Sequence, residues 1–164
     1  MNRLLYIAVL SLGLALGLVA CGDDSCYDNG SSLPLAAFYV GGSQQQVSRM
    51  SVQGIGAPGD SLLADSTTLS EIYLPLRANA SSSSYVFTRW TGPDSIEIAV
   101  SDTIIFTYDA IAFFHSTECG AMFNFQIKRV DYTHNGIDSI VMVNTAITNA
   151  KMTAMRIYFT DLEQ

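Results

Sequence analysis

The feature that most restricts the fold is the two-residue period of the apolar side chains. In the stretch AMFNFQIKRV, Phe123, Phe125 and Ile127 alternate with polar residues, which is the pattern of a strand with one buried face. The segments SIEIAV and MRIYF repeat this alternation. Because no long segment after Leu33 has a helical period, the pattern predicts an all-β domain.

Further apolar runs bring the number of expected strands to about nine. The turn sequences GAPGD, TGPDS and HNG supply the backbone angles that tight connections need. Asn135-Gly136 predicts a hairpin between strands that end near Tyr132 and begin near Ile137, and the serine run at 81–84 predicts a loop tip. The other candidate strands are Leu35–Val40, Val47–Gly54, Leu69–Leu76, Tyr85–Trp90, Thr103–Tyr108, Ile111–Phe114 and Ile137–Val143. Such strands favour a two-sheet antiparallel β-sandwich of immunoglobulin-like type, with a closed β-barrel as the alternative.

The first residues have the layout of a secretory signal. Arg3 precedes an apolar run from Leu4 to Ala20, which Ser11 alone interrupts. The run ends in LVAC, which is similar to the lipobox of bacterial lipoproteins and places its cysteine at position 21. We therefore expect a cleaved signal peptide over residues 1–20.

The lipobox implies that Cys21 becomes a membrane anchor. In such lipoproteins the thiol carries diacylglycerol, and a fatty acid such as palmitate is usually added to the new amino group. Several acyl chains together hold a protein stably on a membrane. No later segment is apolar enough to span a bilayer. We expect a lipidated tether over residues 21–32 and a single β-sandwich domain over residues 33–164.

Two cysteines remain once Cys21 is assigned to lipid. An exported protein can form disulfides, so the pair Cys26 and Cys119 predicts one. Closing a loop of about 100 residues would stabilise the fold by roughly 4 to 5 kcal/mol. The alternative is two thiols that never meet, because sequence carries no geometry.

Charge restricts the partners. The chain has a formal net charge of −7, and removal of Arg3 with the signal would make it about −8. This balance argues against nucleic acid or an anionic membrane surface as an electrostatic partner.

Metal and nucleophile motifs have little support. His115 and Glu118 lie beside Cys119, and His134 follows Asp131 by three residues. Zinc sites need three or four ligands from compact pairs, so scattered histidines at strand ends explain these residues better. The chain has no Gly-x-Ser-x-Gly elbow, phosphate loop or dinucleotide fingerprint. We expect no metal and no cofactor.

Carboxylates and aromatic residues leave two other possibilities. Glu71 with Glu97 could serve glycoside hydrolysis, although exposed strand acids are far commoner. An aromatic platform for stacking sugars is the second, and core packing is the usual role of such residues in sandwiches. The candidate platform residues are Trp90, Tyr85, Tyr73 and Tyr158.

The order of motifs resembles a known group of proteins. A lipobox and a second cysteine precede APGDSLL, LSEIYLPL, DTIIFTYDAIAFFHSTECGAMFNFQI and a closing MRIYF. This order is similar to that of an uncharacterised family of Bacteroidota envelope lipoproteins with a domain of unknown function. Its most specific parts are Leu74-Pro75-Leu76 and the phenylalanine-rich segment that leads into Cys119-Gly120. The resemblance implies an envelope lipoprotein with paired Cys26 and Cys119, and it implies no catalytic residues.

Lipoproteins of that phylum carry two further signals. Acidic residues after the lipidated cysteine direct export to the cell surface, and Asp23 and Asp24 match this signal in part. Their O-glycosylation signal is Asp, then Ser or Thr, then an apolar residue or Thr. Asp-Ser pairs also start turns by bonding to their own backbone, which is the alternative explanation. The matching acceptors are Ser61, Ser66, Ser95, Thr103 and Ser139.

These observations predict an outer-membrane lipoprotein, with a preference for the cell surface over the periplasmic side. We expect a non-catalytic binding or accessory subunit for another envelope protein. A small envelope hydrolase acting on glycan or peptide is one alternative, and it requires acidic residues that converge in a pocket. A glycan-binding module is the other, and it requires a flat, exposed row of aromatic residues.

Overall fold

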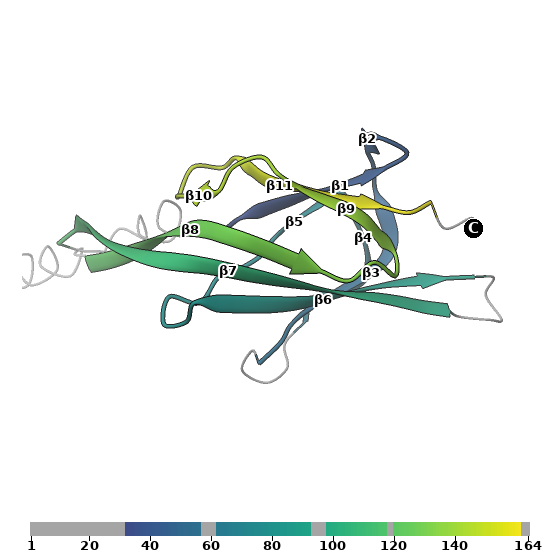
Figure 1. Ribbon diagram of the computed structural model, residues 1–164, viewed down its shortest axis with the longest axis horizontal. Helices are drawn as coiled ribbons and strands as arrows, with labels where there is room; N and C mark the ends of the chain where they lie inside the picture. The colour runs from purple at the N-terminus through teal and green to yellow at the C-terminus, as the bar shows by residue number, and fades with distance from the viewer. Residues whose placement is uncertain (1–31, 57–61, 93–97, 118–119, 162–164) are drawn as a thin grey trace, which may run out of the picture.

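The protein is a sandwich of two β-sheets (Figure 1). The computed structural model describes residues 32–56, 62–92, 98–117 and 120–161. The smaller sheet contains β1 (Leu35–Val40), β2 (Ser43–Gln44), β5 (Glu71–Tyr73), β9 (Ile137–Met142) and β11 (Thr153–Phe159). The larger sheet contains β3 (Val47–Gly54), β4 (Leu62–Leu69), β6 (Ser82–Thr91), β7 (Ile98–Ser116), β8 (Gly120–Tyr132) and β10 (Ala146–Ile147).

The expected two-sheet, mostly antiparallel sandwich is confirmed. The described strands do not join into the single closed sheet of the barrel alternative. The larger sheet has the order β10-β8-β7-β6-β3-β4 and is antiparallel throughout. In the smaller sheet, β1 and β11 pair in parallel, with Phe38 opposite Ile157. No helix among the described residues is long and apolar enough to cross a membrane.

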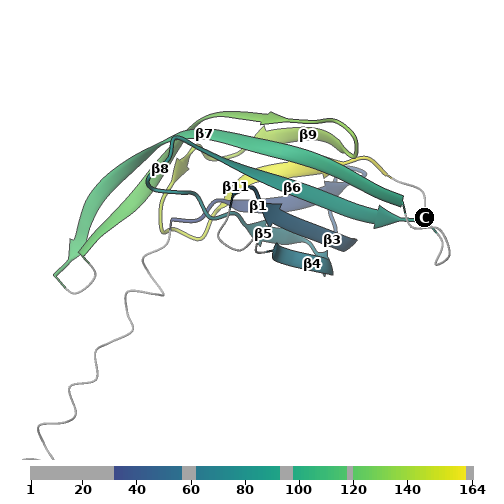
Figure 2. The ribbon, with the colours of Figure 1, turned by 90° about the horizontal axis from the view of Figure 1, so that it is seen from below.

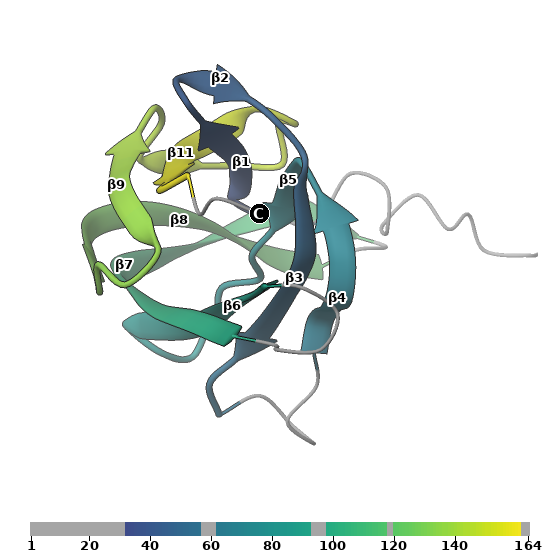
Figure 3. The same cartoon turned by 90° about the vertical axis from the view of Figure 1, so that its right-hand side faces the viewer.

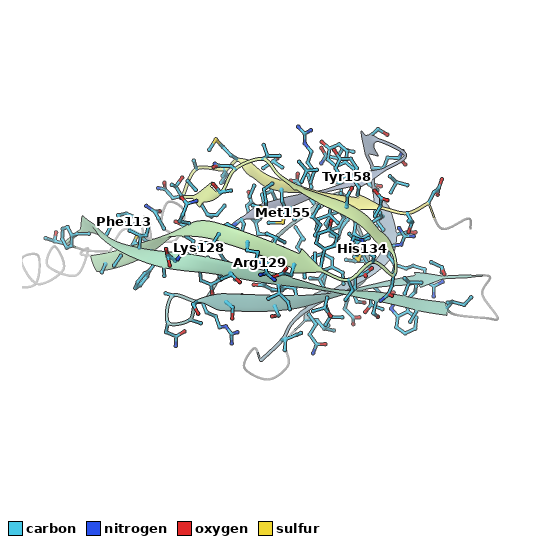
Figure 4. All side chains as sticks on the ribbon, viewed as in Figure 1. Phe113, Lys128, Arg129, His134, Met155 and Tyr158 are labelled. Carbon is cyan, nitrogen blue, oxygen red and sulfur yellow. The ribbon has the colours of Figure 1, made fainter. Side chains whose placement is uncertain are left out.

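The core lies between the sheets, where alternate residues of each strand face inward. Phe38 from the smaller sheet packs edge-on against Phe87 of the larger sheet and against Phe159, with ring centroids 6.2 Å and 5.4 Å apart. Phe106 and Met155 are fully buried beside them. Figure 4 shows Met155 between the two sheets and Tyr158 of the same strand on the outer side. The period of two therefore produces this core, as the sequence predicts.

The serine run is not a loop tip, which corrects the expectation for residues 81–84. Ser82 begins β6, and Ser83 is only 4 % exposed. The Ser83 hydroxyl lies 2.8 Å from the hydroxyl of buried Tyr108, whose hydroxyl also donates to the carbonyl oxygen of Arg77 at 2.9 Å. The Ser83 hydroxyl thus provides a hydrogen-bond partner for a buried phenol.

The Asn135-Gly136 pair does not form a hairpin, because β8 and β9 belong to different sheets. The chain crosses between the sheets at this corner, where the carboxylate of Asp102 binds it. Asp102 is 3 % exposed and accepts bonds from Thr133 Oγ1 at 2.6 Å and from the main-chain N–H groups of residues 135, 136 and 137 at 2.7, 2.7 and 2.9 Å. The Asp102 carboxylate thus accepts the main-chain hydrogen bonds that the opposite strand would accept in a hairpin.

Strand lengths differ from the expectation in two places. β7 is one strand of 19 residues, whereas SIEIAV, Thr103–Tyr108 and Ile111–Phe114 were expected as separate strands. The strand is continuous because Ser101 and Asp102 pair with β6, and Asp109 and Ala110 pair with β8. The predicted strand Leu69–Leu76 is divided between the two sheets. Leu69 is the last residue of β4 in the larger sheet, and β5 belongs to the smaller sheet. β4 itself was not expected, since most of its side chains are exposed and an edge strand carries little apolar alternation.

The β7–β8 hairpin reaches beyond the smaller sheet (Figure 2). The ladder of this hairpin continues from Ile104–Tyr132 to Ser116–Gly120. The opposite end of β7, at Ile98, pairs with Thr91 at the end of β6. The two ends of β7 therefore lie at opposite ends of the molecule.

Candidate functional site

A cavity of about 650 Å³ opens at the end of the sandwich where β6 ends and β7 begins. Figure 3 looks onto this end. The lining comes from the end of β1, the start of β3, the end of β6 and the segment after β11. Its polar residues are Gln45, Gln46, Ser48, Arg49, Arg89, Thr91 and Asp161, beside Trp90.

Arg49 reaches the cavity through an irregularity in β3. Val47 and Met50 both face inward, and the β3–β4 register shifts between them. Arg49 has a φ of 52°, a left-handed conformation that is uncommon for a residue other than glycine. Bulges of this kind redirect a side chain that regular alternation would place elsewhere. Such strain is concentrated at functional sites, so Arg49 marks this cavity as a candidate.

Arg89 forms the inner wall of the cavity. Its Nη1 and Nη2 atoms both donate to the carbonyl oxygen of Thr160 at 3.1 Å, and its guanidinium lies 5.4 Å from the centroid of the Phe159 ring. Burial lowers the pKa of Arg89 below its ordinary value, and the charges of Asp161 and Asp102 oppose this shift. These contacts hold a cation in a fixed position beside the cavity.

The β1–β2 turn positions the amide side chains. Gly41 and Gly42 have φ angles of 59° and 86°. A two-residue turn of this hand requires such positive angles, and residues other than glycine rarely adopt them. Gln45 follows, and its Nε2 donates to the carbonyl oxygen of Val40 at 3.2 Å and to Ser43 Oγ at 3.0 Å. The turn therefore fixes one amide at the cavity wall.

The lining has more positive than negative charge, although the whole chain is acidic. Arg49 and Arg89 face one carboxylate, Asp161, among the described lining residues. Guanidinium groups bind carboxylates strongly, and a half-buried indole such as that of Trp90 offers a flat apolar face. The described lining does not supply the two carboxylates that glycoside hydrolysis requires. The cavity is therefore suited to holding a polar, anionic molecule.

The structure places the predicted acidic and metal-binding residues apart from this cavity or outside the described ranges. Glu71 lies on the outer face of β5, opposite Ala37, and Glu97 is outside the described residues. The Asp131 carboxylate binds Arg129 at 2.7 Å, and the His134 ring packs against Tyr132. The described residues contain no group of three or more potential metal ligands. Side-chain contacts of His115, Glu118 and Cys119 are outside the described part of the chain.

The predicted aromatic row is divided among three places. Trp90 lines the cavity. Tyr85 is buried in the core, where its hydroxyl donates to the carbonyl oxygen of Pro75 and burial raises its pKa to about 12. Tyr73 and Tyr158 face outward on the smaller sheet, where Tyr158 packs 5.0 Å from Tyr39. These four residues thus do not form one surface.

The modification sites are described only in part. Cys21, Cys26, Cys119, Ser61 and Ser95 lie outside the described residues, so the anchor and the disulfide remain predictions. Ser66 is exposed on edge strand β4, whereas Thr103 is half-buried in β7 and Ser139 is half-buried in edge strand β9. Glycosylation of these three residues also remains a prediction.

The sequence reasoning missed the two arginines and Gln45. One signal for Arg89 was present: in YVFTRW it is in phase with Tyr85 and Phe87, which face inward. A cation at an inward position indicates a buried charge with a specific partner. Arg49 carries no such signal, because its direction depends on an irregular pairing of distant residues.

Comparison with known proteins identifies the family. Residues 49–159 match a family of unknown function, DUF6452, so the chain belongs to that family. The match includes Arg49, Arg89 and Trp90. No curated protein and no solved structure matches the chain. The expectation of an uncharacterised family is confirmed, and its members' role is not established by this match.

Proposed function

We propose that this chain, a member of a family of unknown function, is a lipid-anchored, non-catalytic binding module of the bacterial cell envelope. Its cavity receives a saccharide that carries a carboxylate. The observation that carries this proposal is the placement of Arg49, Arg89 and Trp90 around one cavity. The lipobox ending at Cys21 supports the anchor and the envelope location.

The lining matches this ligand class in three respects. A guanidinium can pair with a sugar carboxylate, and an indole can stack on the apolar face of a pyranose ring. Amide and hydroxyl groups from Gln45, Gln46 and Thr91 can bond to sugar hydroxyls. Proteins that bind ligands in this way place a few polar groups around a concave site, and this cavity is in the usual size range.

The binding test uses Trp90, which is the single tryptophan of the chain. The purified lipoprotein in detergent is titrated with oligosaccharides of uronic acids and with the corresponding neutral oligosaccharides. We expect a saturable change in tryptophan fluorescence with the uronates alone. Arg49→Gln should weaken binding by about tenfold, the effect of losing one charged hydrogen bond.

The matched control is Arg156→Gln, which removes an exposed arginine on the outer face of β11 and should leave the affinity unchanged. Equal responses to neutral and acidic sugars, or no response, would contradict the proposed ligand. Release of shortened sugar during the titration would instead favour the hydrolase alternative.

The anchor is tested separately. Mass spectrometry of the protein from cell membranes should find acyl chains on Cys21, and Cys21→Ala should abolish that modification. Cross-linking in cells with the lipidated protein as bait then tests the accessory-subunit role, since a stoichiometric envelope protein should be recovered. An unmodified cysteine in the wild-type protein would rule out the proposed anchor.

A further inference from the structure

The far end of the β7–β8 hairpin exposes large apolar side chains. We call residues 110–117 and 120–124 the hairpin tip. Phe114 is 69 % exposed, Ile111 is 53 % exposed and Phe123 is 37 % exposed. In Figure 4, Phe113 marks this end of the molecule. A cluster of this kind on a monomer indicates contact with something outside the domain.

Both faces of the hairpin tip are apolar. Phe114 and Phe123 lie on the face that continues from buried Tyr108 and Phe125, beyond the cover of the smaller sheet. Ile111 lies on the opposite face, in the cross-strand pair with Asn124. A protein that packs on a sheet covers one face, whereas a lipid phase surrounds a hairpin on both sides.

The described residues of the hairpin tip carry no fixed charge. The described tip residues include no Asp, Glu, Lys or Arg, and Glu118 lies outside the described residues. The nearest described charges are Asp109 and Lys128, which pair with each other at 2.7 Å at the base of the tip. A segment with exposed phenylalanines and little charge is typical of groups that enter the interface of a bilayer.

The part of the chain that carries the proposed anchor joins the fold beside this tip. Ser32 is buried, and its hydroxyl donates to Asn124 Oδ1 at 2.9 Å. Cys21 precedes Ser32 by 11 residues, which can span up to about 36 Å when extended. The tip reaches only about 13 Å beyond Asn124 along β8, from the rise per residue of a strand. A bilayer that holds acyl chains at Cys21 is therefore within reach of the tip.

We infer that the hairpin tip inserts into the lipid bilayer next to the anchor and provides a second membrane contact. This inference rests on the lipid anchor of the proposed function. Two contacts fix the orientation of the domain, whereas a tether alone would leave it free to rotate. The 19 residues of β7 span about 60 Å, so this orientation directs the cavity away from the membrane.

The test measures how deeply single tryptophans enter the bilayer. The lipidated full-length protein carries Trp90→Phe together with Phe114→Trp and is placed in vesicles of phosphatidylcholine and phosphatidylethanolamine. A second set of vesicles contains the same lipids with brominated acyl chains, which quench tryptophan on contact. We expect quenching at position 114 to exceed that of the control by about threefold or more, since only the tip meets acyl chains.

The control is Ile98→Trp in the same background, because Ile98 is 54 % exposed at the other end of the same strand. Ile111→Trp serves as a second tip variant in case the first does not fold. Weak, equal quenching at both ends of β7 in protein that floats with the vesicles would overturn the inference and leave the anchor intact. Strong quenching at both ends would also overturn it, because the domain would then lie flat. Protein without acyl chains at Cys21 would overturn the anchor and the inference together.

Discussion

The two ends of β7 use side chains in opposite ways. At the cavity end, Asp102 is 3 % exposed and Arg89 is 8 % exposed, so charged groups are inside. At the hairpin tip, Phe114 is 69 % exposed, so an aromatic group is outside. Each arrangement is costly by itself, because buried charges lose hydration and exposed apolar surface orders water. Each end therefore requires a compensating partner.

The cavity end has its partners within the chain. Asp102 accepts four hydrogen bonds, and Arg89 donates two. Among the described residues, no buried polar side-chain atom lacks a hydrogen-bond partner. At the hairpin tip, Phe114 and Ile111 are 69 % and 53 % exposed, so most of their apolar surface is left to solvent by the described part of the fold. One end therefore satisfies its buried charges within the fold, whereas the other leaves large apolar side chains exposed.

The strongest test of this comparison is Asp102→Asn. Each oxygen of the carboxylate accepts two bonds, so an amide would bring its NH₂ group against two donors. Leaving buried donors without an acceptor costs about 1–3 kcal/mol each, so we expect a loss of about 2–4 kcal/mol in the free energy of unfolding. Urea unfolding followed by circular dichroism measures this loss.

Asp109→Asn is the control for Asp102→Asn, because Asp109 pairs with Lys128 while its side chain is 54 % exposed. Exposed pairs contribute less than about 1 kcal/mol. Equal effects of the two substitutions would show that burial of Asp102 does not determine its contribution.

A smaller loss is expected for Gly136→Ala at the same corner. A Cβ at this position would lie 2.8 Å from Val100 Cγ1 and 3.5 Å from Asp102 Oδ2. Overpacking of this kind typically costs about 1–3 kcal/mol, measured by the same unfolding assay. An unchanged stability would mean that the Val100 side chain moves aside without disturbing the Asp102 bonds.

The sequence predicts the half-buried strands well and the corner badly. β1 and β3 have the predicted bounds, because each is a short run rich in apolar residues between turn-forming residues. Asn135-Gly136 is a strong local signal for a hairpin, yet the four bonds to Asp102 connect residues more than 30 positions apart in the chain. The residues of the turn itself contain no information about an acceptor so distant in the chain.

The alternation of inward and outward residues along a strand also indicates which charged residues are buried. In SDTIIFTY, Asp102 is in phase with Ile104, Phe106 and Tyr108, which are all buried. The same period places Arg89 among inward residues of β6. Asp102 and Arg89 could thus be recognised as buried, whereas their bonding partners and the direction of Arg49 require the folded arrangement.

The free energy of unfolding is expected to depend on pH through Tyr85, which lies between the two ends. Tyr85 is buried, and its pKa rises from 10.0 to about 12, chiefly through burial. Below pH 10 the phenol is neutral in both states, and its contribution is complete. Between pH 10 and 12 the unfolded tyrosine loses its proton while the folded one keeps it, so the free energy of unfolding falls as pH rises.

Tyr85→Phe removes both the titration and the bond to the Pro75 carbonyl oxygen. We expect a loss of about 0.5–1.5 kcal/mol at neutral pH and a shallower decline above pH 10. Urea midpoints measured from pH 7 to 12 check this expectation. Parallel curves for the two proteins would contradict the assignment of the alkaline slope to Tyr85.

The smallest effect on stability is expected for Phe114→Ser at the hairpin tip. The side chain is 69 % exposed, so its removal should change the free energy of unfolding by less than about 0.5 kcal/mol in detergent-free buffer. A loss above about 1 kcal/mol would show that Phe114 packs within the folded chain, and the two ends of β7 would then differ less than their exposure indicates. If stability is unchanged while the domain loses its fixed orientation on vesicles, the apolar group serves the membrane contact and not the fold.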